Sequence, residues 1–386
     1  MSTDATVPDT VTVPSPLHTR PGFVADASGI VAAHYGNPMA EQRPLSAGLA
    51  VVDLSDRGVL AVSGADRLSW LNSLTSQSLL GLPPGVSTET LLLDASGRLE
   101  HAARLLDDGE TVWLLVDRAE VEPLRSWLDR MRFMLRVEVA DRTAEYATLG
   151  SLADVALPIE VAAPNDVPLV WVDPWATVTA GGHGYAAETG HPGHDWTYRE
   201  TLVARADLDA LAASDVPVAG TLALEALRIE AWRPRLSTEV DEKTIPHELD
   251  WLRSAVHLTK GCYRGQETVA KVHNLGHPPR RLVMLHLDGS DNVLPQHGDA
   301  VVLPVEAGAD DTAEPKQVGR VTSVAVHHEL GPVALAVVKR TTPETAALAV
   351  LAADTVVAAA QQTIVPPDAG ASAGVPRLPR LGSVTR

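Results

Sequence analysis

The most distinctive segment of this 386-residue chain reads Lys260-Gly261-Cys262-Tyr263-Arg264-Gly265-Gln266-Glu267, and we call it the cysteine octet. It contains the single cysteine of the sequence. Lys260 and Arg264 each stand two positions from Cys262. Fixed positive charge favours the thiolate, which is the reactive form of cysteine. The octet therefore predicts a reactive thiol, and the alternative is a small buried apolar residue.

Composition limits the class of protein. Hydrophobic residues make up 45% of the chain, which is enough for a sizeable core. A single cysteine excludes an intramolecular disulfide, and with no basic and apolar leader at the N-terminus it predicts a cytoplasmic protein. No apolar run reaches the roughly 18 residues that a membrane span needs. The net charge of −18 repels phosphate backbones, so we expect no direct nucleic-acid binding.

Five segments can be distinguished along the chain. Residues 1–45 are rich in Pro, Thr, Ser and Ala and are predicted to be a mostly disordered tail. Residues 46–145 and 146–280 each mix strands with helices, and the second of them contains the cysteine octet. Residues 281–355 hold short β-rich runs typical of a small antiparallel barrel, and 356–386 are predicted to be a flexible tail.

The first mixed segment shows the pattern most clearly. Residues 59–63 predict a strand, and Asp66 can cap a following helix that carries Leu68, Leu71 and Leu74 at helical spacing. Hairpins alternate here with helical crossovers. The sequence therefore predicts an α+β fold built in layers and not a doubly wound sheet.

Polar clusters outside the octet allow two interpretations each. Arg228 lies beside the apolar stripe of a predicted helix and can bind a planar carboxylate, or it can form a surface pair with Glu225. The acidic run 239–248 and the histidines of the loop 183–195 match no metal-binding spacing. We interpret both as solvated loops and expect no metal site.

The cysteine octet resembles the signature of the YgfZ family of folate-binding proteins. These are relatives of the glycine-cleavage T-protein, an aminomethyltransferase, and they support iron–sulfur proteins. The likeness runs from about Gly48 to Arg340. Leu227-Arg228-Ile229-Glu230-Ala231 is similar to the Leu-Arg-Leu-Glu-Ala segment that T-proteins and YgfZ proteins share, although Trp232 follows where they have glycine.

This resemblance implies a three-domain cloverleaf with a C-terminal β-barrel and a central site for a reduced folate, tetrahydrofolate or a derivative. It implies that Cys262 and Lys260, both in the octet, are the catalytic residues. The folate contacts that it implies are Arg57, Arg228, Tyr263, Gln266 and Glu267.

Two departures separate the chain from a working aminomethyltransferase. T-proteins carry paired aspartates after a Gly-Gly turn, whereas here Ser96-Gly97-Arg98-Leu99 leads to Glu100-His101. The residues 184–188 match poorly the Tyr-Thr-Gly-Glu segment that grips the pterin in T-proteins. Both departures favour an accessory role over group transfer, which needs a placed acid.

The sequence thus predicts a cytoplasmic, folate-binding accessory protein that supports assembly or repair of iron–sulfur clusters, including those of enzymes that modify tRNA. Its expected partners are folate and iron–sulfur client enzymes, with no membrane partner. One cysteine cannot ligate a cluster alone. The alternatives are a tetrahydrofolate-dependent aminomethyltransferase or demethylase and a non-catalytic scaffold, so enzymatic activity stays open.

Overall fold

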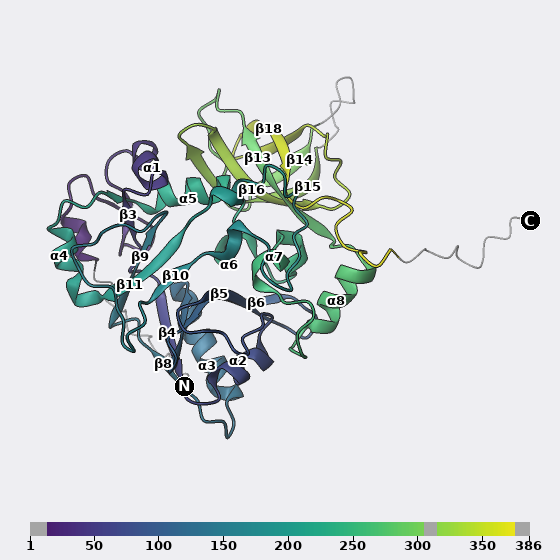
Figure 1. Cartoon of the computed structure of the whole chain (residues 1–386). Helices are drawn as coiled ribbons and strands as arrows, with labels where there is room; N and C mark the ends of the chain where they lie inside the picture. The colour runs from purple at the N-terminus through teal and green to yellow at the C-terminus, as the bar shows by residue number, and fades with distance from the viewer. Residues whose placement is uncertain (1–13, 305–314, 375–386) are drawn as a thin grey trace, which may run out of the picture.

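The first part of the chain forms a five-stranded antiparallel sheet in the computed structural model, which describes residues 14–304 and 315–374 (Figure 1). In spatial order its strands are β5 (Ser87–Leu93), β6 (Leu99–Asp107), β7 (Thr111–Val116), β4 (Gly58–Ser63) and β8 (Glu138–Asp141). Val59 and Ala61 pack into the central core, whereas Leu60 and Val62 pack against helices α2 (Arg67–Leu74) and α3 (Val121–Met131). Successive strand residues point to opposite faces, so both faces of this sheet are buried.

The second sheet lies beside the first and also has five strands. In spatial order they are β10 (Val170–Val172), β11 (Arg199–Ala204), β9 (Tyr146–Ser151), β3 (Val51–Asp53) and β12 (Val218–Ala219). The pair β3–β12 is parallel, and the other pairs are antiparallel. Helices α1 (Pro38–Ser46) and α5 (Thr221–Glu230) pack on each other beside it, and α4 (Leu208–Ala212) covers a smaller cluster.

The C-terminal part is a closed six-stranded barrel. Its strands follow the order β13 (Arg280–Leu287), β16 (Gly331–Lys339), β15 (Lys316–His327), β14 (Ala300–Leu303), β17 (Leu348–Ala352) and β18 (Thr355–Thr363). Residues 356–363, predicted to begin a flexible tail, are the strand that closes the barrel. The reason is that Val357 and Ala359 alternate into its core, being 2% and 6% exposed.

The N-terminal segment also differs from the prediction. Residues 16–46, predicted to be mostly a disordered tail, form η1 (Pro16–Thr19), β1 (Val24–Ala25), β2 (Ala32–His34) and α1. Long-range bonds hold them: Arg20 Nη2 donates to the carbonyl of Val216 at 2.9 Å, and Gln42 Nε2 donates to that of Val326 at 2.9 Å. The remaining parts of the two predicted tails, 1–13 and 375–386, lie outside the described residues.

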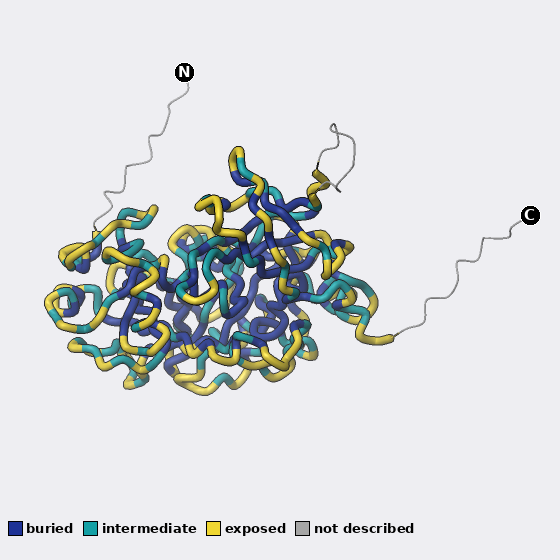
Figure 2. The backbone as a smooth tube through the Cα atoms, turned by 90° about the horizontal axis from the view of Figure 1, so that it is seen from above, coloured by how far each residue is buried: buried dark blue, intermediate teal, exposed yellow. Residues whose placement is uncertain are grey.

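Short helical segments complete the chain. They are η2 (Arg118–Glu120), η3 (Pro174–Ala176), η4 (Pro192–Asp195), η5 (Arg205–Asp207), α6 (Leu236–Glu239), η6 (Pro246–Leu249), α7 (Leu252–Ala255) and α8 (Gln266–Leu275). Figure 2 shows that buried residues are concentrated in the middle of the molecule and exposed residues along its outer edge. Within the described ranges, no helix has both the length and the apolar character to cross a bilayer.

Candidate functional site

A cavity of about 470 Å³ lies between the first and second sheets. Its walls come from β5 and β6, from β10 and the residues just before β11, and from the segment that joins α5 to α6. Residues far apart in sequence, such as Glu89 and Trp251, therefore face the same space. A cavity of this size accommodates a small organic ligand.

The inner wall of the cavity is aromatic. Trp171, Trp196, Tyr198 and Trp251 line it and are at most 5% exposed. The rings of Trp196 and Tyr198 are stacked, with centroids 5.0 Å apart and planes inclined by 25°. Such walls favour a flat heterocycle, since aromatic faces stack on one another.

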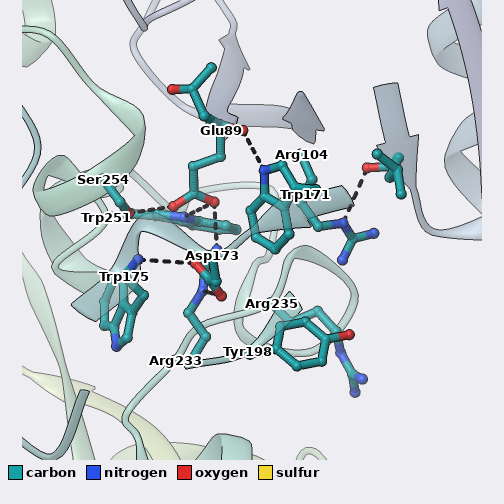
Figure 3. A network of polar contacts seen from close by, with 12 residues as sticks. Glu89, Arg104, Trp171, Asp173, Trp175, Tyr198, Arg233, Arg235, Trp251 and Ser254 are labelled. Atoms are coloured by element: carbon teal, nitrogen blue, oxygen red, sulfur yellow. Dashed lines mark hydrogen bonds and ion pairs between the residues drawn. The ribbon is translucent and has the colours of Figure 1, made fainter. Parts of the chain in front are cut away.

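Two buried carboxylates share one guanidinium in this wall (Figure 3). Arg233 donates from Nη2 to Glu89 at 2.6 Å and from Nε to Asp173 at 2.9 Å. Trp251 Nε1 and Ser254 Oγ also donate to Glu89, and Trp196 Nε1 donates to Asp173. Burial raises the pKa of Asp173, although Arg233 opposes the shift.

A second ion-pair network is centred on Glu200, which is fully buried. Its carboxylate is paired with Arg57, accepts a hydrogen bond of 2.9 Å from Tyr198 Oη, and lies 3.2 Å from Arg104 Nε. Both arginines also line the cavity. Burial alone would lower the pKa of Arg57, but Glu200 and the neighbouring Tyr198, Asp117 and Asp56 together raise it, so the guanidinium stays charged.

Arg228 connects the cavity wall to the barrel. It pairs with Glu225 at 2.6 Å and Glu239 at 3.0 Å, and it donates to Ser323 Oγ of β15 at 2.6 Å. Burial alone would raise the pKa of Glu225, yet Arg228 and Arg235 lower it to about 2. The pair of Arg228 with Glu225, one of the two interpretations of this helix, is present but mostly buried, with side chains 7% and 15% exposed, and it is part of a larger network.

The cysteine octet forms a loop that leads into α8. Cys262 is exposed, whereas Tyr263 beneath it is 8% exposed. Lys260 Nζ donates to the carbonyls of Asn72, Thr75 and Gln77, each at 2.6 Å. Burial lowers the pKa of Lys260 to about 8.

The other polar residues of the octet hold the loop in place. Gln266 Nε2 donates to the carbonyl of Lys260 at 3.0 Å, and Arg264 pairs with Glu100 at 2.7 Å, while Glu267 is exposed. Gly265 has a φ of +85° and packs so closely on the β5–β6 turn that a Cβ would lie 2.7 Å from the carbonyl oxygen of Asp94. The octet is thus fixed against the turn at 94–97.

The structure separates the predicted site residues into two groups. Arg57 and Arg228 line the cavity, whereas Lys260, Cys262, Tyr263, Gln266 and Glu267 are not among its lining residues. A smaller cavity of about 290 Å³ lies between the groups. Its lining includes Glu100, the partner of Arg264, and it shares Asp117 and Glu120 with the larger cavity.

Most of the cavity wall was not found from the sequence. The missed residues are Glu89, Trp171, Asp173, Trp196, Tyr198, Arg233 and Trp251, together with Glu200 behind the wall, which pairs with Arg57. One signal was available: Arg233-Pro234-Arg235 directly follows the segment that resembles T-proteins. In the described part of the chain, no group of three or more His, Cys, Asp or Glu side chains is arranged to hold a metal ion.

Comparisons with known proteins show which sequences the chain is similar to. No family model matches the chain. A chloroplastic transferase of Arabidopsis thaliana is 26% identical over 290 residues, which cover 72% of this chain but only 62% of that protein, less than two thirds of its length. An aminomethyltransferase of Natronomonas pharaonis is 30% identical over 290 residues, covering 72% of this chain and 76% of that protein.

A solved structure confirms the α+β cloverleaf fold with its C-terminal barrel that was expected from the sequence. The glycine cleavage system aminomethyltransferase T from Bartonella henselae matches with a TM-score of 0.68, covering 92% of this chain and 98% of that one. The two sequences are 18% identical, so this match concerns the fold.

Proposed function

We propose, for a chain that belongs to the aminomethyltransferase family, that the central cavity binds a reduced folate such as tetrahydrofolate. The observation that carries the proposal is a cavity with an aromatic inner wall and charged groups fixed by buried ion pairs. Flat heterocycles bind by stacking, and a few placed polar groups set their orientation. The relatives named as aminomethyltransferases support the same ligand class.

The residues present fit a folate. Trp196 and Tyr198 offer faces for a pterin ring, and Arg57 and Arg228, which line the cavity, would contact the folate. Arg233 Nη1 is buried and has no hydrogen-bond acceptor among the described residues. A bound ligand would explain this buried, unpaired donor, because a small shift of the Arg233 side chain would let the ligand accept a hydrogen bond from it.

We further propose that folate binding serves an accessory role in the assembly or repair of iron–sulfur enzymes, including those that modify tRNA. Cys262 would supply one thiolate to a cluster shared with a client enzyme, and Lys260 would hold its loop. The lone cysteine agrees with a reducing compartment such as the cytoplasm. The exposed position of Cys262 leaves it accessible to such a partner.

The residues after the β5–β6 turn also support the accessory role. Glu100 pairs with Arg264, and His101 pairs with Glu120. Both side chains occupy the region where T-proteins carry their paired aspartates, and both are engaged, Glu100 in an ion pair and His101 in a hydrogen bond. An acid already paired in this way is less suited to handle a proton at a bound folate.

A second candidate function is tetrahydrofolate-dependent aminomethyl transfer or demethylation. The names of the relatives favour it, since several are aminomethyltransferases. Turnover of an aminomethyl or methylamine donor with tetrahydrofolate distinguishes the two functions. Under the accessory role there is no turnover, and activity that is fully retained in Cys262→Ser would establish the transferase instead.

The decisive experiment combines binding with complementation. Calorimetry should detect tetrahydrofolate binding to the wild type and to Cys262→Ser alike, because Cys262 does not line the cavity. Cys262→Ser should nevertheless fail to restore iron–sulfur enzyme activity in a strain that lacks the protein. Full rescue by this folded variant would rule out the thiol role, and absence of folate binding would point to a scaffold.

A further inference from the structure

An exposed apolar segment joins α3 to β8 on the side of the first sheet that faces away from the barrel, and we call residues 132–136 the apolar loop (Figure 1). Its residues Phe133, Met134 and Leu135 are 80%, 98% and 43% exposed. Within the described ranges, no other run of three consecutive large apolar residues is exposed. Single exposed apolar side chains are ordinary, whereas a contiguous group of them marks an interaction surface.

The apolar loop is anchored at both ends. Trp70 Nε1 of α2 donates to the carbonyl of Met131, just before the loop, at 3.2 Å. At the other end the backbone N–H and Nε of Arg136 each donate to Asp66 Oδ2 at 3.0 Å. Phe133, between these anchors, has a φ of +46°, a left-handed conformation that a bulky residue rarely adopts. A loop held in this way presents its tip to a partner with little loss of conformational entropy on binding.

The charges beside the apolar loop indicate what kind of partner can cover it. The charged residues in the loop, next to it or bound to it are Arg130, Arg132, Arg136, Asp66, Asp129 and Glu138. The arginines and the acids balance, while the whole chain carries a net charge of −18. An anionic bilayer attracts clusters of basic residues, and a strongly charged chain repels its own copies. A different protein is therefore the favoured partner.

Helix α2 connects the apolar loop to the cysteine octet. Asp66, at its N-terminal end, binds Arg136 of the apolar loop. At its other end, the carbonyls of Asn72 and Thr75 accept hydrogen bonds from Lys260 Nζ. A helix of 8 residues is about 12 Å long, whereas a standard protein interface covers roughly 800 Å² of each partner. A protein that sits on the apolar loop can therefore also reach the octet.

Resting on the proposed function, we propose that the apolar loop is the docking site for the iron–sulfur client protein, whose surface offers an apolar pocket with carboxylates at its rim. Phe133 and Met134 fill the pocket, since aromatic side chains and methionine are enriched at the centres of protein interfaces. Arg130 and Arg132 pair with the carboxylates, because within the described residues Arg130 forms no ion pair and Arg132 has one at 3.8 Å. The client then lies against both ends of α2, next to the octet.

Complementation with matched variants tests the docking site. In a strain that lacks the protein, Phe133→Ser/Met134→Ser should restore at most about one fifth of the iron–sulfur enzyme activity that the wild type restores, because few side chains dominate such interfaces. Met134→Ser alone should also lower it, and Met134→Leu should retain most of it. Val356→Ser removes a residue of the barrel that is 62% exposed, and this control should rescue fully.

Charge variants test the rim of the interface. Arg130→Glu/Arg132→Glu should lower rescue, whereas Glu138→Gln should leave it unchanged. Calorimetry with tetrahydrofolate and thermal unfolding should give wild-type values for every variant, because these side chains are exposed and do not line the cavity. If the double serine variant fails to fold, Met134→Ser decides, since Met134 is 98% exposed.

The outcomes separate the docking site from the accessory role. Full rescue by the serine variants, in a strain where the wild type rescues and Cys262→Ser does not, would overturn the docking site and leave the accessory role standing. Failure of the wild type to rescue would refute the accessory role and the docking site with it.

Two further assays address the other occupants of the apolar loop. The first is binding to vesicles of phosphatidylcholine and phosphatidylserine, and the second is sedimentation velocity of the protein alone. We expect no vesicle binding and a monomer. Vesicle binding or a dimer that is present in the wild type and lost in Met134→Ser would assign the loop to a membrane or to a second copy, and either result would overturn the proposal.

Discussion

Replacing Arg233 with methionine tests the buried ion pairs that form the cavity wall. The variant leaves Glu89 and Asp173 without their shared cation, although both side chains are at most 4% exposed. Removing one partner of a buried ion pair costs about 3–5 kcal/mol, because the remaining charge is neither solvated nor compensated. Arg233 also lies over the ring of Trp175 at 5.1 Å, so lost packing adds to this cost.

Urea unfolding at pH 7, followed by circular dichroism, measures this effect. The deficit of Arg233→Met should shrink as the pH is lowered from 7 to 5. Burial raises the pKa of Asp173 and Arg233 lowers it, so loss of Arg233 raises it further; the folded protein then binds a proton before the unfolded chain does, and acidification favours folding. The triple variant Arg233→Met/Glu89→Gln/Asp173→Asn should recover at least about 1 kcal/mol. A loss below about 1 kcal/mol in Arg233→Met would contradict the reasoning.

Two further predictions concern backbone strain and pH. Gly265→Ala should destabilise the protein by about 1–3 kcal/mol, because its φ is +85° and the added Cβ meets Asp94. Gly261→Ala is the control: it has open space around it and should change the free energy of unfolding by less than about 0.5 kcal/mol. Equal effects of the two variants in denaturant titrations would argue against this packing. Burial lowers the pKa of His247 to about 4, so on acidification the unfolded chain takes up a proton before the folded protein does. This residue should therefore lower the free energy of unfolding by about 2 kcal/mol between pH 7 and pH 5. His247→Gln should flatten that part of the stability profile, and an unchanged slope would show that other groups dominate it.

Local patterns predicted the strands and much of the barrel. The residues 59–63 lie within β4 (Gly58–Ser63), since their continuous apolar run fits a strand buried on both faces. Asp66 occupies the helix N-cap position as expected, yet its carboxylate binds Arg136, 70 positions away, and does not cap the backbone. Order in 16–46 depends on bonds such as that of Gln42 with Val326, which no local pattern indicates.

The same limit applies to the site. The octet predicted a reactive thiol and left a buried apolar residue as the alternative, and Cys262 is exposed. The cations beside it were expected to act on Cys262, but Lys260 Nζ is held by three backbone carbonyls and Arg264 by Glu100. The wall of the cavity joins Glu89 to Arg233 across 144 positions, so its chemistry emerges only when the sheets pack together.

The guanidinium of Arg233 acts as a rivet between two sheets, since Glu89 belongs to β5 and Asp173 follows β10. Sliding of one sheet past the other would break both contacts at once. The distance between the two sheets is therefore fixed when the protein folds. Ligand binding then does not include the entropic cost of bringing the cavity walls together. Entry of a ligand then depends on motions at the edge of the cavity and not on separation of the two sheets.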